Sequence, residues 1–440
     1  MNQKRKITTV TLGCKVNQYE TDAMCQLLED AGYEIVSSKE NADIYIVNTC
    51  SVTNMADRKS RQMLHRAKKQ NPNAIVIAVG CYVQAAGEIL LEDEYIDLVI
   101  GNNKKKDIVS IIEEYMEEHS KNSCIIDIAH TYDYEEMHTA AAGEHTRAYL
   151  KVQDGCNQFC SYCIIPYTRG RIRSRNIEEV KKEVIELTEK GYREVVITGI
   201  HVSSYGKDFE GNVTLLDLIQ AITSIEGLER IRLGSLEPRI ITEEFVKALS
   251  KNPKLCPHFH LSLQSGCDET LKRMNRHYTT GEYQEKCQLL RQYFDRPALT
   301  TDVIVGFPGE TEEEFHKTAE YLERICLNEM HIFKFSARKG TKAETMEHQV
   351  SEQVKTARSK ILLDMSDSHK EAYANSFIGE QVNVLVEEKT IIKGEEYYVG
   401  HTENYLRVAF IAEDSCINQI VTVYLVRLLD SDTILGHLQK

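Results

Sequence analysis

Long apolar segments are missing from this chain of 440 residues, although 42% of its residues are hydrophobic. No stretch approaches the roughly 18 uninterrupted apolar residues that a membrane-spanning helix requires, so we expect no membrane partner. The N-terminal segment MNQKRKITTVTLGCK contains basic residues but lacks the apolar run of a signal peptide. We therefore expect a cytoplasmic protein.

Positive charge is in deficit, because 53 lysines and arginines face 67 acidic residues and give a formal net charge of −14. Taken globally, this acidity argues against a nucleic-acid partner, but local patches matter more than the total. Two segments are strongly basic, RKSRQMLHRAKK at 58–69 and RGRIRSR at 169–175. The first is interpreted as a solvated helix face made of Arg58, Lys59, Arg61, Arg66, Lys68 and Lys69.

Cysteine, in contrast, is abundant: the chain has 13, an odd number. A reducing cytoplasm disfavours disulfides, so metal ligation or catalysis is the better expectation. Seven of the cysteines show no motif spacing and are interpreted as small buried apolar residues. These seven are Cys25, Cys124, Cys256, Cys267, Cys287, Cys326 and Cys416.

Three blocks of different pattern follow one another along the chain. Residues 5–118 alternate β-rich and helical segments, with a helix expected from Glu20, and predict a parallel α/β domain. Residues 119–146 are polar and are interpreted as a linker. Residues 147–374 contain six strand–helix repeats and a connecting helix, fewer than the eight repeats of a full barrel, so a partial (β/α)6 barrel is predicted. Residues 375–440 alternate as β-strands and predict a small all-β barrel.

The segment GCNQFCSYCIIPYTRG, residues 155–170, places Cys156, Cys160 and Cys163 close together with no fourth cysteine nearby. Structural zinc sites use four protein ligands, commonly in CxxC pairs, and fit this spacing poorly. A 4Fe–4S cluster takes one thiolate per iron. Three cysteines would leave one iron open to a substrate or cofactor.

This CxxxCxxC motif, with Tyr162 before its last cysteine and a barrel strand before it, resembles the radical S-adenosylmethionine superfamily. The resemblance implies that the open iron binds S-adenosylmethionine and that the site generates a 5′-deoxyadenosyl radical. It also implies cofactor contacts at the strand C-termini, although each matching residue alone could belong to an ordinary turn. The candidate cofactor-binding residues are Tyr162, Gly199, Glu237, Ser262, Gln264 and Gly306. Ser262 and Gln264 are expected on one strand face.

Three more cysteines, Cys14, Cys50 and Cys81, each follow a predicted strand, in VTLGC, VNTC and AVGC. Neighbouring parallel strands end at the same edge of a sheet, so these cysteines could meet in space. The alternative is three unrelated core cysteines. The repeated placement favours a second three-cysteine cluster, also with one open iron.

Two such clusters followed by a small β-barrel resemble the methylthiotransferase family, with its N-terminal cluster domain, radical domain and C-terminal TRAM domain. The segments LGCKVNQYETDAM, NTCSVTNMADRKSR and AVGCYVQ most resemble the branch that acts on threonylcarbamoyladenosine in tRNA. The isopentenyladenosine branch usually has glutamine and methionine where this chain has Lys15 and Val16, and the ribosomal-protein branch usually has a proline there.

The resemblance implies that one S-adenosylmethionine methylates a sulfur at the N-terminal cluster and that a second supplies the radical. The methylthio group would reach C2 of the adenine at tRNA position 37, in the anticodon stem-loop. An electron donor such as flavodoxin or ferredoxin would be needed. The alternatives are the same reaction on isopentenyladenosine tRNA or a ribosomal protein, a non-catalytic iron–sulfur RNA-binding protein, and a zinc-binding structural protein.

The expected tRNA contacts are the alternate arginines after the radical motif, which could share one face and bind phosphates. They are Arg169, Arg171, Arg173 and Arg175. The C-terminal barrel resembles an RNA-binding module, yet residues 380–440 carry ten acidic and five basic residues. Tyr397, Tyr398 and Tyr405 could stack on bases there, although strand aromatics are more often structural.

Overall fold

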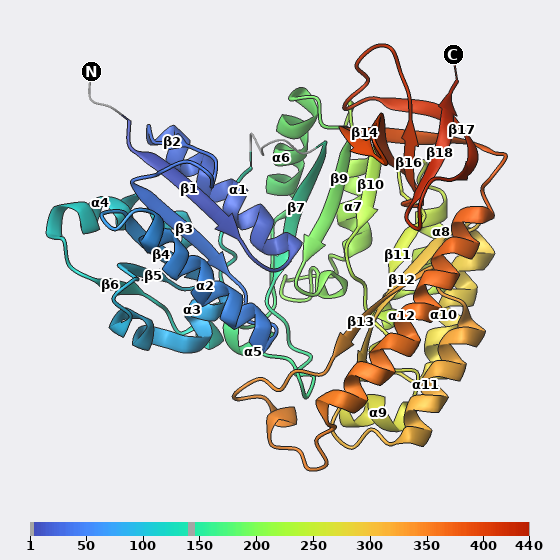
Figure 1. Ribbon diagram of the computed structural model, residues 1–440, viewed down its shortest axis with the longest axis horizontal. Coiled ribbons are helices and arrows are strands. Elements are labelled where there is room, and N and C mark those ends of the chain that lie inside the picture. The colour runs from blue at the N-terminus through green and yellow to red at the C-terminus, as the bar shows by residue number, and fades with distance from the viewer. Residues whose placement is uncertain (1–3, 140–145, 440) are drawn as a thin grey trace.

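The N-terminal unit is built on a six-stranded parallel sheet with helices on both faces (Figure 1). The structure is a computed structural model that describes residues 4–139 and 146–439. The sheet order is β2-β1-β3-β4-β5-β6. The strands are β1 (Lys6–Thr11), β2 (Glu34–Ile35), β3 (Ile44–Thr49), β4 (Ile75–Gly80), β5 (Leu98–Ile100) and β6 (Asn122–Cys124). The chain order reverses between β1 and β3, which is where open α/β sheets form a crevice at their carboxyl edge.

The helices of this unit cover the sheet in pairs. One apolar cluster joins α1 (Lys15–Asp30) and α4 (Ile108–Glu118) to one face, through Met24, Leu28 and Ile112. A second cluster joins α2 (Asn54–Gln70) and α3 (Cys81–Ala86) to the opposite face, through Leu64 and Val83. Short 3-10 turns complete the unit: η1 (Gly87–Glu92), η2 (Lys105–Asp107) and η3 (Ile128–His130).

The central unit is an open barrel of six parallel strands. They are β7 (Arg147–Asp154), β9 (Glu194–Gly199), β10 (Arg230–Leu233), β11 (His258–His260), β12 (Ala298–Val305) and β13 (Glu329–Lys334). Isolated bridges from Ile231 to Leu255 and from Leu236 to Leu261 connect the β10 and β11 edges. A short antiparallel strand, β8 (Arg173–Ser174), pairs with the end of β7. The fold class predicted from the sequence is confirmed here.

Helices surround the outside of this barrel and hold its largest apolar cluster against the strands (Figure 1). They are α6 (Ile177–Glu189), α7 (Leu215–Thr223), α8 (Glu243–Ser250), α9 (Asp268–Arg273), α10 (Thr280–Tyr293), α11 (Glu312–Ile325) and α12 (Glu352–Asn375), with η4 (Val202–Ser204), η5 (Pro238–Ile240) and η6 (Lys342–Glu344). A further short helix, α5 (Ile165–Thr168), instead contacts α3 of the N-terminal unit. Thr311 forms a capping box with Glu314 at the start of α11. None of the described helices has both the length and the apolar character needed to cross a bilayer.

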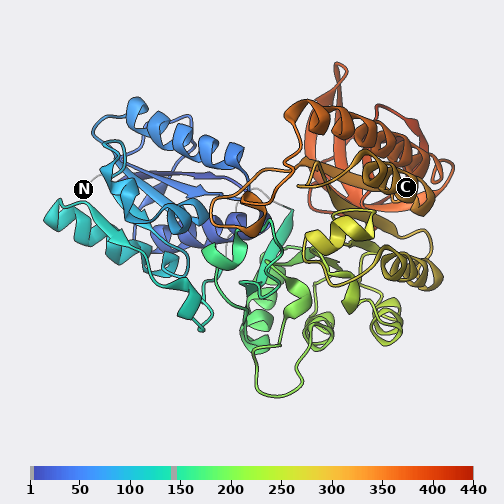
Figure 2. The same ribbon diagram turned by 90° about the horizontal axis from the view of Figure 1, so that it is seen from below.

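The C-terminal unit is a closed five-stranded barrel in the order β14-β15-β16-β18-β17. Its strands are β14 (Gln381–Ile392), β15 (Glu395–Thr402), β16 (Arg407–Phe410), β17 (Ile420–Leu428) and β18 (Thr433–Leu438). It lies on the opposite side of the central unit from the N-terminal sheet in both views (Figures 1 and 2).

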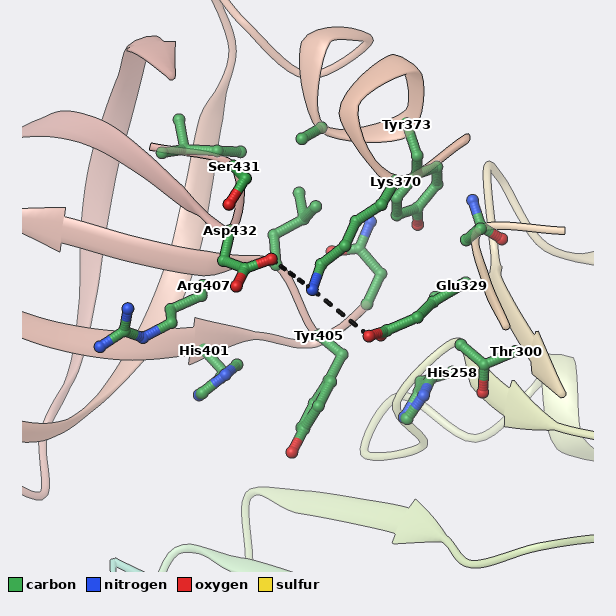
Figure 3. A pocket seen from close by; sticks show the side chains of 16 residues that line it. His258, Thr300, Glu329, Lys370, Tyr373, His401, Tyr405, Arg407, Ser431 and Asp432 are labelled. Atoms are coloured by element: carbon green, nitrogen blue, oxygen red, sulfur yellow. Dashed lines mark hydrogen bonds and ion pairs between the residues drawn. The ribbon is translucent and has the colours of Figure 1, made fainter. Parts of the chain in front are cut away.

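Tyr405 connects this small barrel to the base of the central one. Its ring stacks between His258, at the start of β11, and His401, with centroid distances of 4.7 and 4.6 Å. Arg232 donates to the carbonyls of Thr402 and Glu403 in the same loop. A cavity of about 350 Å³ lies at this junction, and Lys370 bridges Glu329 and Asp432 across it (Figure 3). The base of the central barrel is therefore closed by the C-terminal unit.

Two sequence-based boundaries differ from the structure. The first helix begins at Lys15 rather than Glu20, because Cys14 occupies its N-cap position. The expected linker, 119–146, contains β6 and η3, and Glu135 and Met137 within it are buried. Residues 140–145 of that segment lie outside the described residues. Polar composition did not make the segment a free linker, because its groups form hydrogen bonds with both neighbouring units. Glu135 and Met137 accept from Lys106 and Tyr19 of the N-terminal unit, and Thr139 donates to Glu183 of the central unit.

Candidate active site

Cys14, Cys50 and Cys81 converge at the carboxyl edge of the N-terminal sheet. They follow β1, β3 and β4, and β1 and β3 flank the point where the strand order reverses. A Cβ atom at Gly13, which has φ +104°, would lie 2.9 Å from the Sγ atom of Cys50, so the loop before Cys14 passes directly against that thiol. Burial first, and then the neighbouring Cys81 and Cys14, raise the pKa of Cys50 to about 11.

A thiolate cluster at this edge would need compensating positive charge, and the buried Arg169 is placed to provide it. Its guanidinium opposes the rise in the pKa of Cys50. The Nδ2 atom of Asn102 lies 3.5 Å from the Sγ atom of Cys81. Three converging thiols beside a buried cation fit an iron–sulfur cluster with three protein ligands.

Cys156, Cys160 and Cys163 lie in one loop after β7. Gly155 starts the loop with φ +69°, and a Cβ atom there would lie 1.8 Å from the carbonyl oxygen of Arg171. The amide of Cys163 donates to the carbonyl of Cys160 at 3.0 Å, which folds the three thiols toward one another. Burial raises the pKa of Cys156 to about 11, and the nearby Cys160 acts in the same direction. A hydrogen bond from the amide of Gln158 opposes this rise.

Arg276 supplies the cation at this second triad. Its Nη1 atom donates to the Sγ atom of Cys160 at 3.1 Å, and its Nε atom donates to the hydroxyl of Tyr278 at 3.0 Å. A guanidinium that donates to a thiolate sulfur stabilises its charged form, and such contacts tune cluster potentials. The loop therefore also fits a cluster with three protein ligands.

The candidate cofactor residues lie around the strand C-termini near this loop, with different local roles. The ring of Tyr162 packs edge-on against Phe307, 6.3 Å between centroids. Glu237 is buried, ion-paired with Arg239 at 3.0 Å, and close enough to Cys156 to raise the pKa of that thiol. Both stay predictions as cofactor contacts.

The two candidate glycines have structural reasons for being glycine. A Cβ atom at Gly199 would lie 2.9 Å from the carbonyl oxygen of Gln153, and one at Gly306, which has φ +72°, would lie 2.3 Å from the Cγ atom of Lys355. Ser262 and Gln264 do not share a strand face as expected. β11 ends at His260, and Gln264 has φ +73°, which breaks the strand alternation.

The expectation that four alternate arginines form a phosphate-binding face is wrong for three of them. Arg169, Arg173 and Arg175 are completely buried. Arg173 lies in β8, which pairs with the end of β7, and Arg169 follows α5 and pairs with Glu20 and Asp154. Arg175 forms ion pairs with Glu183 and Glu136. Only Arg171 is exposed, with its guanidinium 4.8 Å from the ring centroid of Phe159.

The other predicted nucleic-acid features are also largely structural. Tyr397 and Tyr398 are buried in the C-terminal barrel, and Tyr405 is held between two histidines. The basic face of α2 is solvent-exposed as interpreted, except that Lys68 is partly buried and pairs with Asp97 at 2.7 Å. The predicted basic groups that are solvent-exposed are therefore Arg171 and the cations of α2 other than Lys68.

A buried charge network joins the two cysteine sites. Glu20, on α1 of the N-terminal unit, accepts from Lys105 at 2.6 Å, from Lys151 at 2.7 Å and from Arg169 at 2.8 Å. Arg169 and Lys151 also pair with Asp154, whose carboxylate accepts from the amide of Gly155 at 2.8 Å. The network is therefore continuous from the unit that carries Cys81 to the loop that carries Cys156.

Sequence reasoning missed Glu20, Lys151 and Arg276. Lys151 gave a usable signal, because a lysine inside the strand AYLKVQD must either reach solvent or find a buried carboxylate. Glu20 and Arg276 gave none, since each lies in a segment with many other charges and acts on residues far away in the chain.

Comparisons with known proteins agree with this architecture. Residues 150–322 match the family described as the Radical SAM superfamily, and residues 6–101 match Uncharacterized protein family UPF0004. Among solved structures, the methyltransferase TsrM from Kitasatospora setae covers 78% of this chain and 77% of its own, with a TM-score of 0.57 and 15% identity, a likeness of fold. These matches and the three-cysteine loop define a radical S-adenosylmethionine enzyme.

Full-length relatives narrow the class. The chain is 40% identical to threonylcarbamoyladenosine tRNA methylthiotransferase MtaB of Bacillus subtilis, over 95% of this chain and 93% of the relative. It is 40% identical to the protein of that name from Aquifex aeolicus, over 92% and 98%. It is 34% identical to tRNA-2-methylthio-N(6)-dimethylallyladenosine synthase of Clostridium tetani, over 97% and 95%. The chain belongs to the radical S-adenosylmethionine tRNA methylthiotransferase family, as predicted.

Proposed function

We propose that this enzyme adds a methylthio group to C2 of N6-threonylcarbamoyladenosine at position 37 of tRNA. The observation that carries the proposal is the full-length similarity of 37–40% to relatives named for this substrate. Relatives named for dimethylallyladenosine are 34% identical. That second substrate is the alternative that the experiment below must separate.

In this proposal Cys156, Cys160 and Cys163 hold one 4Fe–4S cluster, and Cys14, Cys50 and Cys81 hold the other. The first cluster, with S-adenosylmethionine on its open iron, would supply the 5′-deoxyadenosyl radical that an unactivated C–H bond requires.

The surrounding side chains would orient these groups. Arg276 and Arg169 would hold positive charge beside the two sets of thiolates, and Glu237 would lie beside the radical loop. Tyr162, Gly199, Ser262, Gln264 and Gly306 would line the cofactor site at the strand ends.

Arg171 is the one arginine of the predicted set that is free to contact a tRNA phosphate. We propose a cytoplasmic location, as expected for an enzyme that acts on tRNA. The radical step consumes one electron, so we assign a low-potential donor of the flavodoxin or ferredoxin type as a partner.

The test is mass spectrometry of tRNA nucleosides from cells that lack the endogenous activity. We expect the wild type and the control Cys326→Ser, at an exposed position, to restore methylthio-threonylcarbamoyladenosine. Cys156→Ala and Cys50→Ala should not restore it, but purified Cys50→Ala should still form 5′-deoxyadenosine. A methylthio group found only on dimethylallyladenosine would overturn the substrate assignment.

A further inference from the structure

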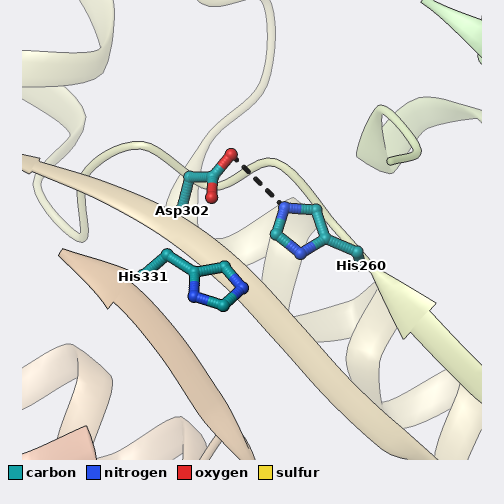
Figure 4. A group of neighbouring side chains, drawn as sticks. All are labelled: His260, Asp302 and His331. Carbon is teal, nitrogen blue, oxygen red and sulfur yellow. Dashed lines mark ion pairs between the residues drawn. The ribbon is translucent and has the colours of Figure 1, made fainter. Parts of the chain in front are cut away.

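The interior wall of the open barrel carries a polar group that no role above uses. His260 on β11, Asp302 on β12 and His331 on β13 each place one side-chain nitrogen or oxygen atom within 4.8 Å of the other two (Figure 4). The strand register pairs Asp302 with His331 and places His260 beside Thr300. Alternate residues of the same strands, such as Phe259, point outward into the apolar core. The polar wall therefore faces the barrel interior.

The wall has unused hydrogen-bonding capacity. The Nδ1 atom of His260 lies 3.0 Å from the hydroxyl of Thr300, which fixes the ring. Its Nε2 atom lies 3.3 Å from the Oδ2 atom of Asp302 but makes no hydrogen bond within the described residues. His331 stacks on His260 at 5.7 Å, and no hydrogen bond or ion pair joins it to another described residue. Three partly satisfied polar groups thus line one space.

A cavity begins next to this wall, toward the C-terminal unit. The 350 Å³ cavity at the barrel base is lined by Thr300 and Glu329, from the same interior face of β12 and β13 that carries the wall. The wall itself offers histidine nitrogens as donors and the Asp302 carboxylate as an acceptor. It therefore suits a ligand group that carries both an anionic acceptor and hydrogen-bond donors.

We propose that His260, Asp302 and His331 recognise the polar end of the threonylcarbamoyl substituent of the substrate. The proposal rests on the proposed function. The substituent offers a carboxylate to the histidines, and hydroxyl and ureido hydrogens to the Asp302 carboxylate. Asp302 lies four residues before Gly306, so the wall begins within about 13 Å of the strand end where the base would enter.

The same wall discriminates against a dimethylallyl substituent. That group is apolar and uncharged, so it would desolvate the wall and leave its polar atoms unpaired. A site built to hydrogen-bond its substrate rejects an analogue that lacks those groups far more strongly than an apolar pocket rejects a change in size. The wall is therefore a specificity determinant, separate from the radical chemistry at Cys156.

The test compares anaerobic binding of three anticodon stem-loops, carrying threonylcarbamoyladenosine, dimethylallyladenosine or plain adenosine, to the reconstituted full-length enzyme. The variants are His331→Phe, which keeps the ring stack on His260 but removes its nitrogens, and Asp302→Asn, which keeps the shape of Asp302. We expect each to lose about tenfold in affinity for the threonylcarbamoyl loop, with plain-loop affinity unchanged. His316→Phe, at an exposed position on α11, is the matched control.

The readouts separate recognition from folding and from chemistry. Formation of 5′-deoxyadenosine without tRNA should be the same in all variants, and His331→Gln, which restores a donor, should recover part of the lost affinity. If the wild type prefers the threonylcarbamoyl loop and the two wall variants keep that preference, the role of the wall is refuted and the proposed function still stands. If the wild type shows no such preference, the proposed function fails with it. A preference that vanishes with a chelator and returns with Zn²⁺ would overturn direct recognition in favour of a metal site.

Discussion

Glu20→Gln is the substitution that most directly tests the buried network. Burial alone would raise the pKa of Glu20, but Arg169, Lys105 and Lys151 outweigh it and hold that pKa well below 4.5. The neutral amide would leave Lys151 and Arg169 with Asp154, and Lys105 with the side-chain oxygen of Asn102. Removing one partner of a buried ion pair costs about 3–5 kcal/mol. The carboxylate belongs to one unit and two of its cations to the other, so the loss should weaken their docking.

The assay is thermal unfolding of the two proteins side by side. If the N-terminal and central units, about 370 residues, unfold together, their unfolding entropy is about 0.8 kcal/mol/K, and 3–5 kcal/mol corresponds to about 4–6 °C. The exposed pair formed by Glu178 and Lys181 provides the control Glu178→Gln, with an expected change within about 0.5 kcal/mol. The folded pKa of Glu20 lies below its unfolded value, which is about 4.3 for a glutamate. The stability difference should therefore be constant from pH 8 to pH 6 and should shrink only as the pH falls below the unfolded value. Equal melting temperatures for the two variants would refute this reasoning.

Three further predictions concern other contacts. Arg276→Leu removes the donor to Cys160 and should make the potential of the radical cluster more negative by about 60 mV, the equivalent of 1.4 kcal/mol, in an EPR redox titration; an unchanged potential would contradict that role. Tyr405→Ala should lower the free energy of unfolding by about 2–4 kcal/mol and expose the junction before β14 to proteases, whereas Tyr405→Phe should behave as the wild type. Equal protease resistance of Tyr405→Ala and the wild type would contradict the role of Tyr405 in joining the two barrels. Arg171→Ala should weaken tRNA binding and reduce its salt dependence by about one phosphate contact, and an unchanged salt slope would exclude that contact.

The positions of the six candidate ligands could be predicted from sequence because they depend on strand ends. Parallel strands end at one edge, so cysteines that directly follow β1, β3 and β4 had to approach one another once the strands were recognised. The radical loop could be predicted without any strand assignment, since its three cysteines are within one short segment. The closed C-terminal barrel followed from alternating patterns in the same way.

The arginines show where such reasoning stops. The pattern RGRIRSR is the same whether its alternate residues face solvent or a buried carboxylate. The choice depends on partners distant in the chain, and Glu20 lies 149 positions from Arg169. The wall of His260, Asp302 and His331 was missed for a related reason, because each strand contributes one residue and only the register between strands brings them together.

The two cysteine sites differ in what must happen before they can hold metal. Cys156, Cys160 and Cys163 belong to one loop, so a partly folded chain could already present them together. Cys14, Cys50 and Cys81 come from three strand ends and meet only after β1, β3 and β4 have paired. Contacts between distant segments form late, because loop closure must precede them. Maturation of this enzyme should therefore be ordered, with the radical loop ready for iron delivery early and the N-terminal site ready only in a chain that has completed its sheet.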